Sequence, residues 1–185
     1  MILVGCEDLG GPTDETLATA DLLILRQQAA APAPGNETIW VVNSRPVTLN
    51  VLHPDAGNTL YLRIEFPSGS LDALGGTPLG PTDSVQVTVR PRSGEYGFSI
   101  SPSGLVFATG ALPRATLDYA VYGDRSVADG VPTYADRDAY SAALDIWTEV
   151  TSGQWGRTPS TAPIGVDAVE GRVEAAGNYV AAAPR

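Results

Sequence analysis

The chain has 185 residues, of which 43% are hydrophobic, and this is enough for one domain with its own core and a short appendage. Its 21 acidic and 11 basic residues give a formal net charge of −10. This field repels phosphates, so nucleic acids and anionic membrane surfaces are poor partners. The single cysteine excludes an intramolecular disulfide, and no apolar run approaches the length of a membrane-spanning helix.

Residues 1–6 contain the first motif, the run Leu3-Val4-Gly5-Cys6. This aliphatic-small-small-cysteine pattern resembles a bacterial lipobox, which implies lipid on Cys6 and a location in the cell envelope, outside the cytoplasm. The five residues before Cys6 are too few for the charged and apolar regions of a signal peptide, so we interpret residues 1–6 as a remnant of one. The alternative is a free cysteine near a cytoplasmic terminus.

Residues 7–37 have the composition of a tether. The run Gly10-Gly11-Pro12 opens this segment and the Ala-Pro repeat of residues 30–35 closes it, which is typical of a semi-rigid spacer. Between them, Thr13 followed by two acidic residues favours a helix over residues 13–28. The apolar run at residues 22–25 fits a short buried strand equally well, because its periodicity does not separate the two.

Residues 38–185 show the alternation of an antiparallel β-sandwich, and we predict an all-β domain over this range. Apolar and polar residues alternate along residues 60–66 and again along residues 85–90. Proline and glycine separate the segments at short intervals, as in a sandwich. Further predicted strands cover residues 39–43, 47–52, 96–100, 105–107, 116–122, 144–151, 154–157 and 166–175.

One short helix is predicted to interrupt the strands near residues 134–143. Thr133 and Asp136 stand in the spacing of a capping box. Ala135, Ala139 and Ala142 then follow at helical intervals.

Three runs in the predicted sandwich resemble a series that recurs in bacterial surface lipoproteins. They are residues 64–71 (IEFPSGSL), 83–89 (DSVQVTV) and 101–107 (SPSGLVF), followed by a strand that ends at Tyr119. The pattern is similar to the β-sandwich domain shared by ankyrins and netrin receptors, and it extends from about residue 38 through the hairpin of residues 147–155 to the closing residues 178–181. The resemblance implies a non-enzymatic surface module whose role is protein interaction.

The predicted strand at residues 144–151 carries candidate ligand-binding residues. Asp145, Trp147 and Glu149 alternate and therefore share one face. The two carboxylates would lie about 13 Å apart, which is outside the range for either geometry of glycoside hydrolysis. This face could instead bind a sugar, whose ring would stack on Trp147 and whose hydroxyls would be held by Asp145 and Glu149. The alternative is an ordinary solvated strand face with Trp147 at the rim of the sandwich.

The burial of the tryptophans is predicted from a two-residue turn at Ser152 and Gly153. That turn pairs Thr151 with Gln154 and then Val150 with Trp155. Trp155 would face inward with Leu144, Ile146 and Val150, and only Trp147 would be exposed.

Other candidate chemistry is sparse. His53 is the only histidine, it lies in the turn Leu52-His53-Pro54-Asp55, and we predict an exposed turn residue rather than a general base. No nucleophile elbow and no H-E-x-x-H helix occurs, so we do not expect an enzyme.

The aspartates of residues 124–138 offer candidate Ca²⁺ ligands, of which we retain Asp124 and Asp129. With Gly130 as the turn glycine of an EF-hand loop, Arg125 and Val127 would stand at ligand positions, and neither ligates. The remaining interpretation is loop and helix-cap aspartates. No other cofactor is expected.

These features together predict a lipid-anchored, non-enzymatic envelope module whose partner is a protein or a glycan. Contact with a membrane is expected only through lipid on Cys6.

Overall fold

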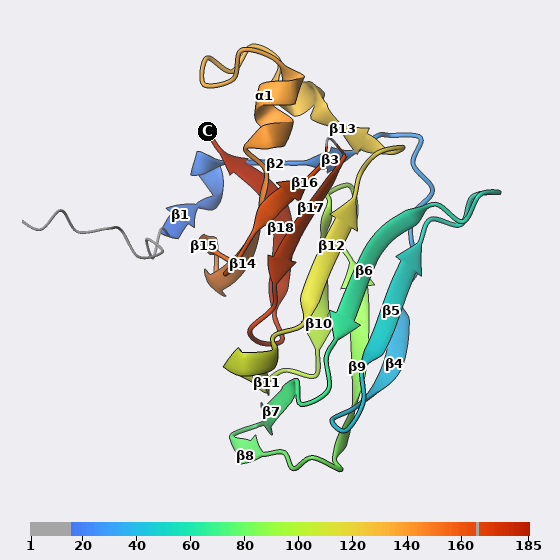
Figure 1. Cartoon of the computed structure of the whole chain (residues 1–185). Coiled ribbons are helices and arrows are strands. Elements are labelled where there is room, and N and C mark those ends of the chain that lie inside the picture. The colour runs from blue at the N-terminus through green and yellow to red at the C-terminus, as the bar shows by residue number, and fades with distance from the viewer. Residues whose placement is uncertain (1–15, 166) are drawn as a thin grey trace, which may run out of the picture.

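The computed structural model describes residues 16–165 and 167–185, and there the chain forms an all-β fold with one short α-helix (Figure 1). This confirms the predicted fold class. The strands are β1 (Thr16–Ala18), β2 (Leu22–Ile24), β3 (Arg26–Gln27), β4 (Glu37–Val42), β5 (Val47–Leu52), β6 (Leu60–Phe66), β7 (Leu71–Leu74), β8 (Thr77–Pro78), β9 (Ser84–Pro91), β10 (Gly97–Ser101), β11 (Leu105–Phe107), β12 (Arg114–Asp118), β13 (Gly123–Asp124), β14 (Asp145–Thr151), β15 (Gln154–Arg157), β16 (Ala162–Ile164), β17 (Ala168–Arg172) and β18 (Asn178–Pro184). The helix α1 spans Arg137–Ala142, and 3₁₀ turns occupy Thr19–Asp21, Thr109–Ala111 and Arg125–Ala128.

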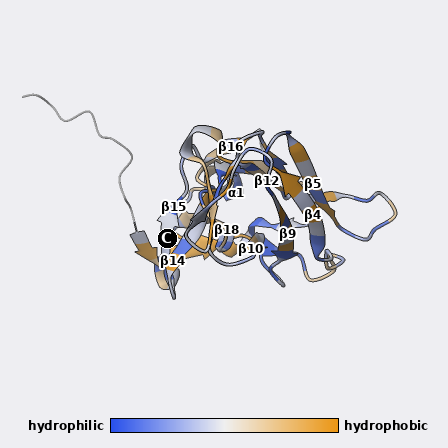
Figure 2. Cartoon of the chain, turned by 90° about the horizontal axis from the view of Figure 1, so that it is seen from below, coloured by the Kyte–Doolittle hydropathy of each residue, from blue (hydrophilic) through white to orange (hydrophobic). Residues whose placement is uncertain are grey.

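Two antiparallel sheets pack face to face and form the sandwich (Figures 1 and 2). The larger sheet has the strand order β1-β15-β14-β18-β10-β9-β4, and β2 also pairs with β18. The second sheet has the order β16-β17-β12-β6-β5. Among the described strands, β4 and β5 therefore form the edges of the two sheets on the same side of the sandwich.

The alternation predicted for the sandwich strands is confirmed in β6 and β9. Their inward side chains are buried between the sheets, and most of the intervening polar ones face solvent. Tyr61 departs from the pattern because it is also fully buried. Its hydroxyl donates to the carbonyl of Gly97 at 2.6 Å, which satisfies the polar end of the ring inside the protein.

The short helix predicted near residues 134–143 is confirmed as α1, although its cap differs from the prediction. The helix begins at Arg137, and the Oδ1 atom of Asp136 accepts a hydrogen bond from the backbone N–H of Ala139 at 2.7 Å. Asp136 therefore takes the capping position that the spacing had given to Thr133. No helix in the described part of the chain is long and apolar enough to span a membrane.

The predicted tether over residues 7–37 is wrong for residues 16–27, and so is the helix favoured over residues 13–28. In Figure 1 this part of the chain runs from β1 across the top of the sandwich to β3, before the chain descends to β4. It pairs on the way with three strands that are distant in sequence, β15, β18 and β13. Residues 16–27, called here the N-terminal strap, are part of the fold.

The apolar run of the strap is buried on both of its faces, which explains why its periodicity was ambiguous. Leu23 and Leu25 contribute to the core between the two sheets. Leu22 points to the opposite face and joins a second apolar cluster on the outer surface of the larger sheet. This outer tryptophan cluster consists of Leu22, Trp147, Trp155, Val180 and Ala182, with Leu17 and Ile24 packed against it.

Candidate functional site

Trp147, the predicted sugar platform, is fully buried. It lies in the outer tryptophan cluster, where side chains of the strap cover it. Its indole N–H donates to the backbone carbonyl of Ala182 at 3.0 Å, so the polar atom of the ring is also satisfied inside the protein. The prediction of an exposed Trp147 is therefore wrong, and this residue has no face to offer to a ligand.

Trp147 does lie on the predicted outer face, and Leu22 of the strap buries it there. A β-bulge places Trp155 on that same face. Thr151 pairs with Gln154 as predicted, but the register then shifts and Glu149, instead of Val150, stands opposite Trp155. This shift of one residue moves Trp155 to the outer face that Trp147 occupies. Trp155 is buried as predicted, but in the outer cluster, whereas Val150 at the bulge has a relative exposure of 53%.

The two carboxylates predicted to flank Trp147 serve the structure. Asp145 is buried and forms an ion pair with Arg157 at 2.5 Å. Glu149 accepts hydrogen bonds from the backbone N–H of Gly153 at 3.1 Å and from the side-chain amide of Asn178 at 2.6 Å. The hydrogen bond from Asn178 lowers the pKa of the Glu149 carboxyl. Neither carboxylate borders an accessible aromatic ring.

The candidate Ca²⁺ ligands Asp124 and Asp129 each have a hydrogen-bond partner within the protein. Asp129 accepts two hydrogen bonds from the guanidinium of Arg137, which lowers the pKa of the Asp129 carboxyl. Asp124 accepts from the backbone N–H of Ser126 and caps the 3₁₀ turn that follows. Within residues 16–165 and 167–185, no three His, Cys, Asp or Glu side chains gather as a metal site would require. Cys6, the candidate lipidation site, lies outside the described residues.

His53 is buried, which corrects the prediction of an exposed turn residue. Its Nδ1 atom lies 2.7 Å from the carbonyl oxygen of Pro32, so Nδ1 carries the proton and donates this bond. The ring packs edge-on against Tyr61 and Tyr122. The segment that follows the strap thus covers His53, and the imidazole is walled off from any substrate in solution.

The third tryptophan, Trp40, is the exposed one. It lies on the edge strand β4 with a relative exposure of 57%, while its neighbour Val41 is fully buried in the core. Gln86 of β9 stands directly opposite Trp40 in the register. One step along the strands, the hydroxyls of Thr38 and Thr88 lie 2.9 Å apart and are hydrogen-bonded.

Trp40 belongs to a surface that we call the polar face, formed by the outward residues of three strands. They are Thr38, Trp40 and Val42 of β4, Ser84, Gln86, Thr88 and Arg90 of β9, and Ser99 and Ser101 of β10. None of the nine is acidic, although the chain has a net charge of −10. Their only charged group, the guanidinium of Arg90, donates to the hydroxyl of Ser101 at 3.2 Å.

The sequence contained a partial signal for this surface. Thr38, Trp40 and Val42 alternate with Ile39 and Val41, but four of these five residues are apolar, so either set could have been the buried one. Only the pairing with β9, whose parity is clear, places Trp40 outside.

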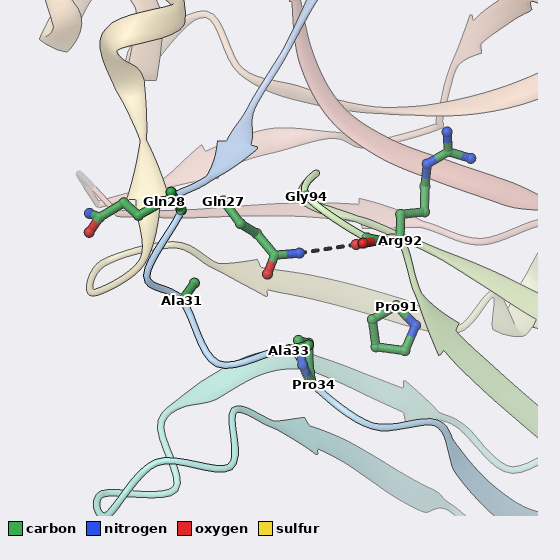
Figure 3. Close-up of a pocket in the computed structure, with 10 residues that line it drawn as sticks. Gln27, Gln28, Ala31, Ala33, Pro34, Pro91, Arg92 and Gly94 are labelled. Atoms are coloured by element: carbon green, nitrogen blue, oxygen red, sulfur yellow. Dashed lines mark hydrogen bonds between the residues drawn. The ribbon is translucent and has the colours of Figure 1, made fainter.

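Two pockets lie away from the polar face, and neither brings together a set of catalytic or metal-binding side chains. The pocket of Figure 3, about 300 Å³, lies between residues 27–34 and the β9–β10 turn, and alanine and proline form much of its wall. The Gln27 amide donates to the carbonyl of Arg92 at 3.0 Å and is thereby engaged. A second pocket of about 340 Å³ lies beside β2, near Arg26 and Arg185.

No protein-family model, no curated protein and no solved structure matches this chain.

Proposed function

We propose that this protein is a non-enzymatic binding module of the cell envelope, held at a membrane by lipid on Cys6, and that it recognises its partner through the polar face. The observation that carries the proposal is the exposure of Trp40 on an ordered sheet surface. Large aromatic residues supply much of the binding energy where proteins recognise partners, and they contribute it only when they are accessible.

The surroundings of His53 support a non-enzymatic role. Histidine is the most common general base at neutral pH, and the only histidine of this chain is enclosed, with Nδ1 bonded to the Pro32 carbonyl. Asp145 and Glu149, the carboxylates that the sequence put forward, are held by Arg157, Asn178 and Gly153.

Lipid on Cys6 would hold the domain close to a membrane. Thr16, where β1 begins, stands ten positions after Cys6 in the sequence. A fully extended chain spans at most about 3.6 Å per residue, so lipid on Cys6 would keep Thr16 within roughly 36 Å of the anchored residue. The tether that the sequence predicted over residues 7–37 would have reached about three times as far.

Binding to isolated envelopes tests the recognition surface. Purified protein with the Trp40→Ala substitution should bind envelopes at least about tenfold more weakly than the unsubstituted protein. Val150→Ala is the matched control, because Val150 is similarly exposed on the same sheet but lies outside the polar face, and it should bind normally. Equal binding by the Trp40→Ala variant would refute the proposal.

The anchor has a separate test. Metabolic labelling with a palmitate analogue, using the complete reading frame, should tag the protein, and Cys6→Ser should abolish the label. An unlabelled product from the complete frame would refute the anchor.

A further inference from the structure

We infer that the ligand of the polar face is an uncharged glycan, with a sugar ring stacked on the indole of Trp40. This inference rests on the proposed function and adds the chemical class of the partner. It is carried by the accessibility of the indole, by the groups that surround it and by the charge of the face.

The indole of Trp40 is positioned and accessible. The strand that carries it is paired with β9 along its whole length, from Glu37 opposite Val89 to Val42 opposite Ser84. The side chains of Ile39 and Val41 pack on the opposite side of β4, into the core. The N–H groups of Trp147 and Trp155 are bonded within the protein, whereas that of Trp40 donates to no residue in the described ranges. Trp40 therefore presents both an apolar ring and an N–H donor that no described residue engages.

The groups around the indole match the hydroxyls of a sugar. Cross-strand neighbours lie about 5 Å apart at Cβ and diagonal ones about 7 to 8 Å apart, so Gln86 and then Ser84 and Thr88 flank Trp40 on its β9 side. An amide and hydroxyls both donate and accept hydrogen bonds, as sugar hydroxyls do. The C–H face of a pyranose on the indole and its hydroxyls on these side chains would satisfy both chemistries at once.

The charge of the face favours a neutral ligand. None of its nine residues is acidic, and its one cation, Arg90, is bonded to Ser101. Glu149, a carboxylate on the same side of the sheet, lies on β14 beyond β18 and is already bonded to Asn178. A cationic partner would find no countercharge on this face, and an anionic partner would be repelled by the net charge of −10.

The face has few apolar side chains to form the centre of a stable protein interface. Such an interface buries about 800 Å² on each partner and has an apolar centre. Among the exposed large hydrophobic side chains, only Trp40 lies on the polar face, and Val42 beside it is half-buried. One aromatic ring with neighbouring hydroxyl and amide groups suits a ligand of a few sugar units better than it suits a protein partner.

Titration of the isotopically labelled full chain with neutral oligosaccharides tests this inference. The probes are cellohexaose, chitohexaose and maltohexaose, at concentrations up to about 5 mM, which covers a dissociation constant on the order of 1 mM. At least one should shift the NMR signal of the Trp40 indole N–H and those of the Gln86 amide. Trp40→Ala should weaken binding at least about tenfold, Gln86→Ala less, and Val150→Ala not at all.

The outcomes separate this inference from the proposed function. Absence of any shift with all three oligosaccharides overturns the glycan assignment. If envelopes still bind through Trp40 in that case, and protease treatment of the envelopes removes the binding, the partner is a protein and the proposed recognition surface survives. Shifts that leave Trp40 and Gln86 unchanged also overturn the inference, because the sugar then binds elsewhere. If Trp40→Ala leaves envelope binding unchanged, the proposed function fails as well.

Discussion

The outer surface of the larger sheet has two regions that both contain tryptophan but differ in accessibility. One is the outer tryptophan cluster, which is covered, and the other is the polar face, which is open to solvent. At one end, Trp147 and Trp155 lie beneath the N-terminal strap, and their indole N–H groups donate to Ala182 and Thr19. At the other end, Trp40 points from the same side of the sheet into solvent. All three tryptophans of the chain therefore lie on one sheet surface. The strap covers Trp147 and Trp155 and leaves Trp40 accessible to a ligand.

The boundary between the two regions is marked by polar contacts. Asn178 stands opposite Ser99 at the end of the polar face and donates to Glu149 at 2.6 Å. Beyond this pair the guanidinium of Arg92 lies 5.7 Å from the centre of the Trp155 ring, so a cation covers part of the cluster edge. The covered region is thus closed by the strap and by neighbouring side chains, and the open region begins where they end.

The largest expected effect is on the strap itself. Leu25→Asp should unfold the protein at neutral pH, because an unpaired charge at a fully buried position costs more than a marginally stable domain of this size can lose. Ala20→Asp, at an exposed position in the same strap, is the control and should change the unfolding free energy by less than about 0.5 kcal/mol. Far-ultraviolet circular dichroism and thermal melting measure both. A folded Leu25→Asp variant would mean that the strap is a tether after all.

Truncation of the covered tryptophans should have the next largest effect. Trp147→Ala should lower the unfolding free energy by about 3 to 5 kcal/mol, because it opens a cavity in the outer tryptophan cluster and leaves the Ala182 carbonyl without its donor. Trp155→Ala should cost a similar amount. Guanidinium denaturation gives both values. A loss below about 1 kcal/mol for Trp147→Ala would contradict its burial.

A smaller effect on stability is expected at Asp55, in the loop that follows β5. Asp55 accepts hydrogen bonds from Thr59 and Tyr122, and the one from the Thr59 hydroxyl contributes most to lowering the pKa of the Asp55 carboxyl. A lowered folded-state pKa means that this stabilisation is present above the ordinary value near 4 and is lost as the pH falls below it. Asp55→Asn should therefore reduce stability at pH 7 and flatten its decline between about pH 4 and pH 2.

Denaturant midpoints at several pH values test this prediction, with Asp72→Asn, at an exposed position, as control. An unchanged acid profile in Asp55→Asn would show that other carboxylates govern the decline.

The smallest effect on stability is expected at Trp40. Trp40→Ala should remove less than about 0.5 kcal/mol of packing free energy, because the ring buries little surface. A small further loss is expected because alanine has a lower strand propensity than tryptophan. Acrylamide quenching of tryptophan fluorescence provides the sharper measurement. The unsubstituted protein should show one readily quenched component, and Trp40→Ala should remove it. Persistence of that component would show that Trp147 or Trp155 is accessible.

The sequence by itself determined the class of the fold and most of its strands. Alternation along residues 60–66 and 85–90 predicted the inward side chains correctly. A strand with one buried face has apolar residues at every second position, so its sequence shows which side faces the core. The helix near residues 134–143 followed from the spacing of its alanines, although its N-cap is Asp136 and not Thr133. These features depend on neighbours a few residues apart.

Only the tertiary structure decided which of the remaining side chains are accessible. Trp147 is buried by Leu22, more than a hundred positions away, and His53 is buried by Pro32 from a segment that resembled a spacer. The bulge that turns Trp155 outward depends on how two strands pair, and neither strand alone encodes it. Burial arises from contacts between distant segments, so residue types and spacing identified the aromatic and acidic candidates but not which of them a ligand can reach.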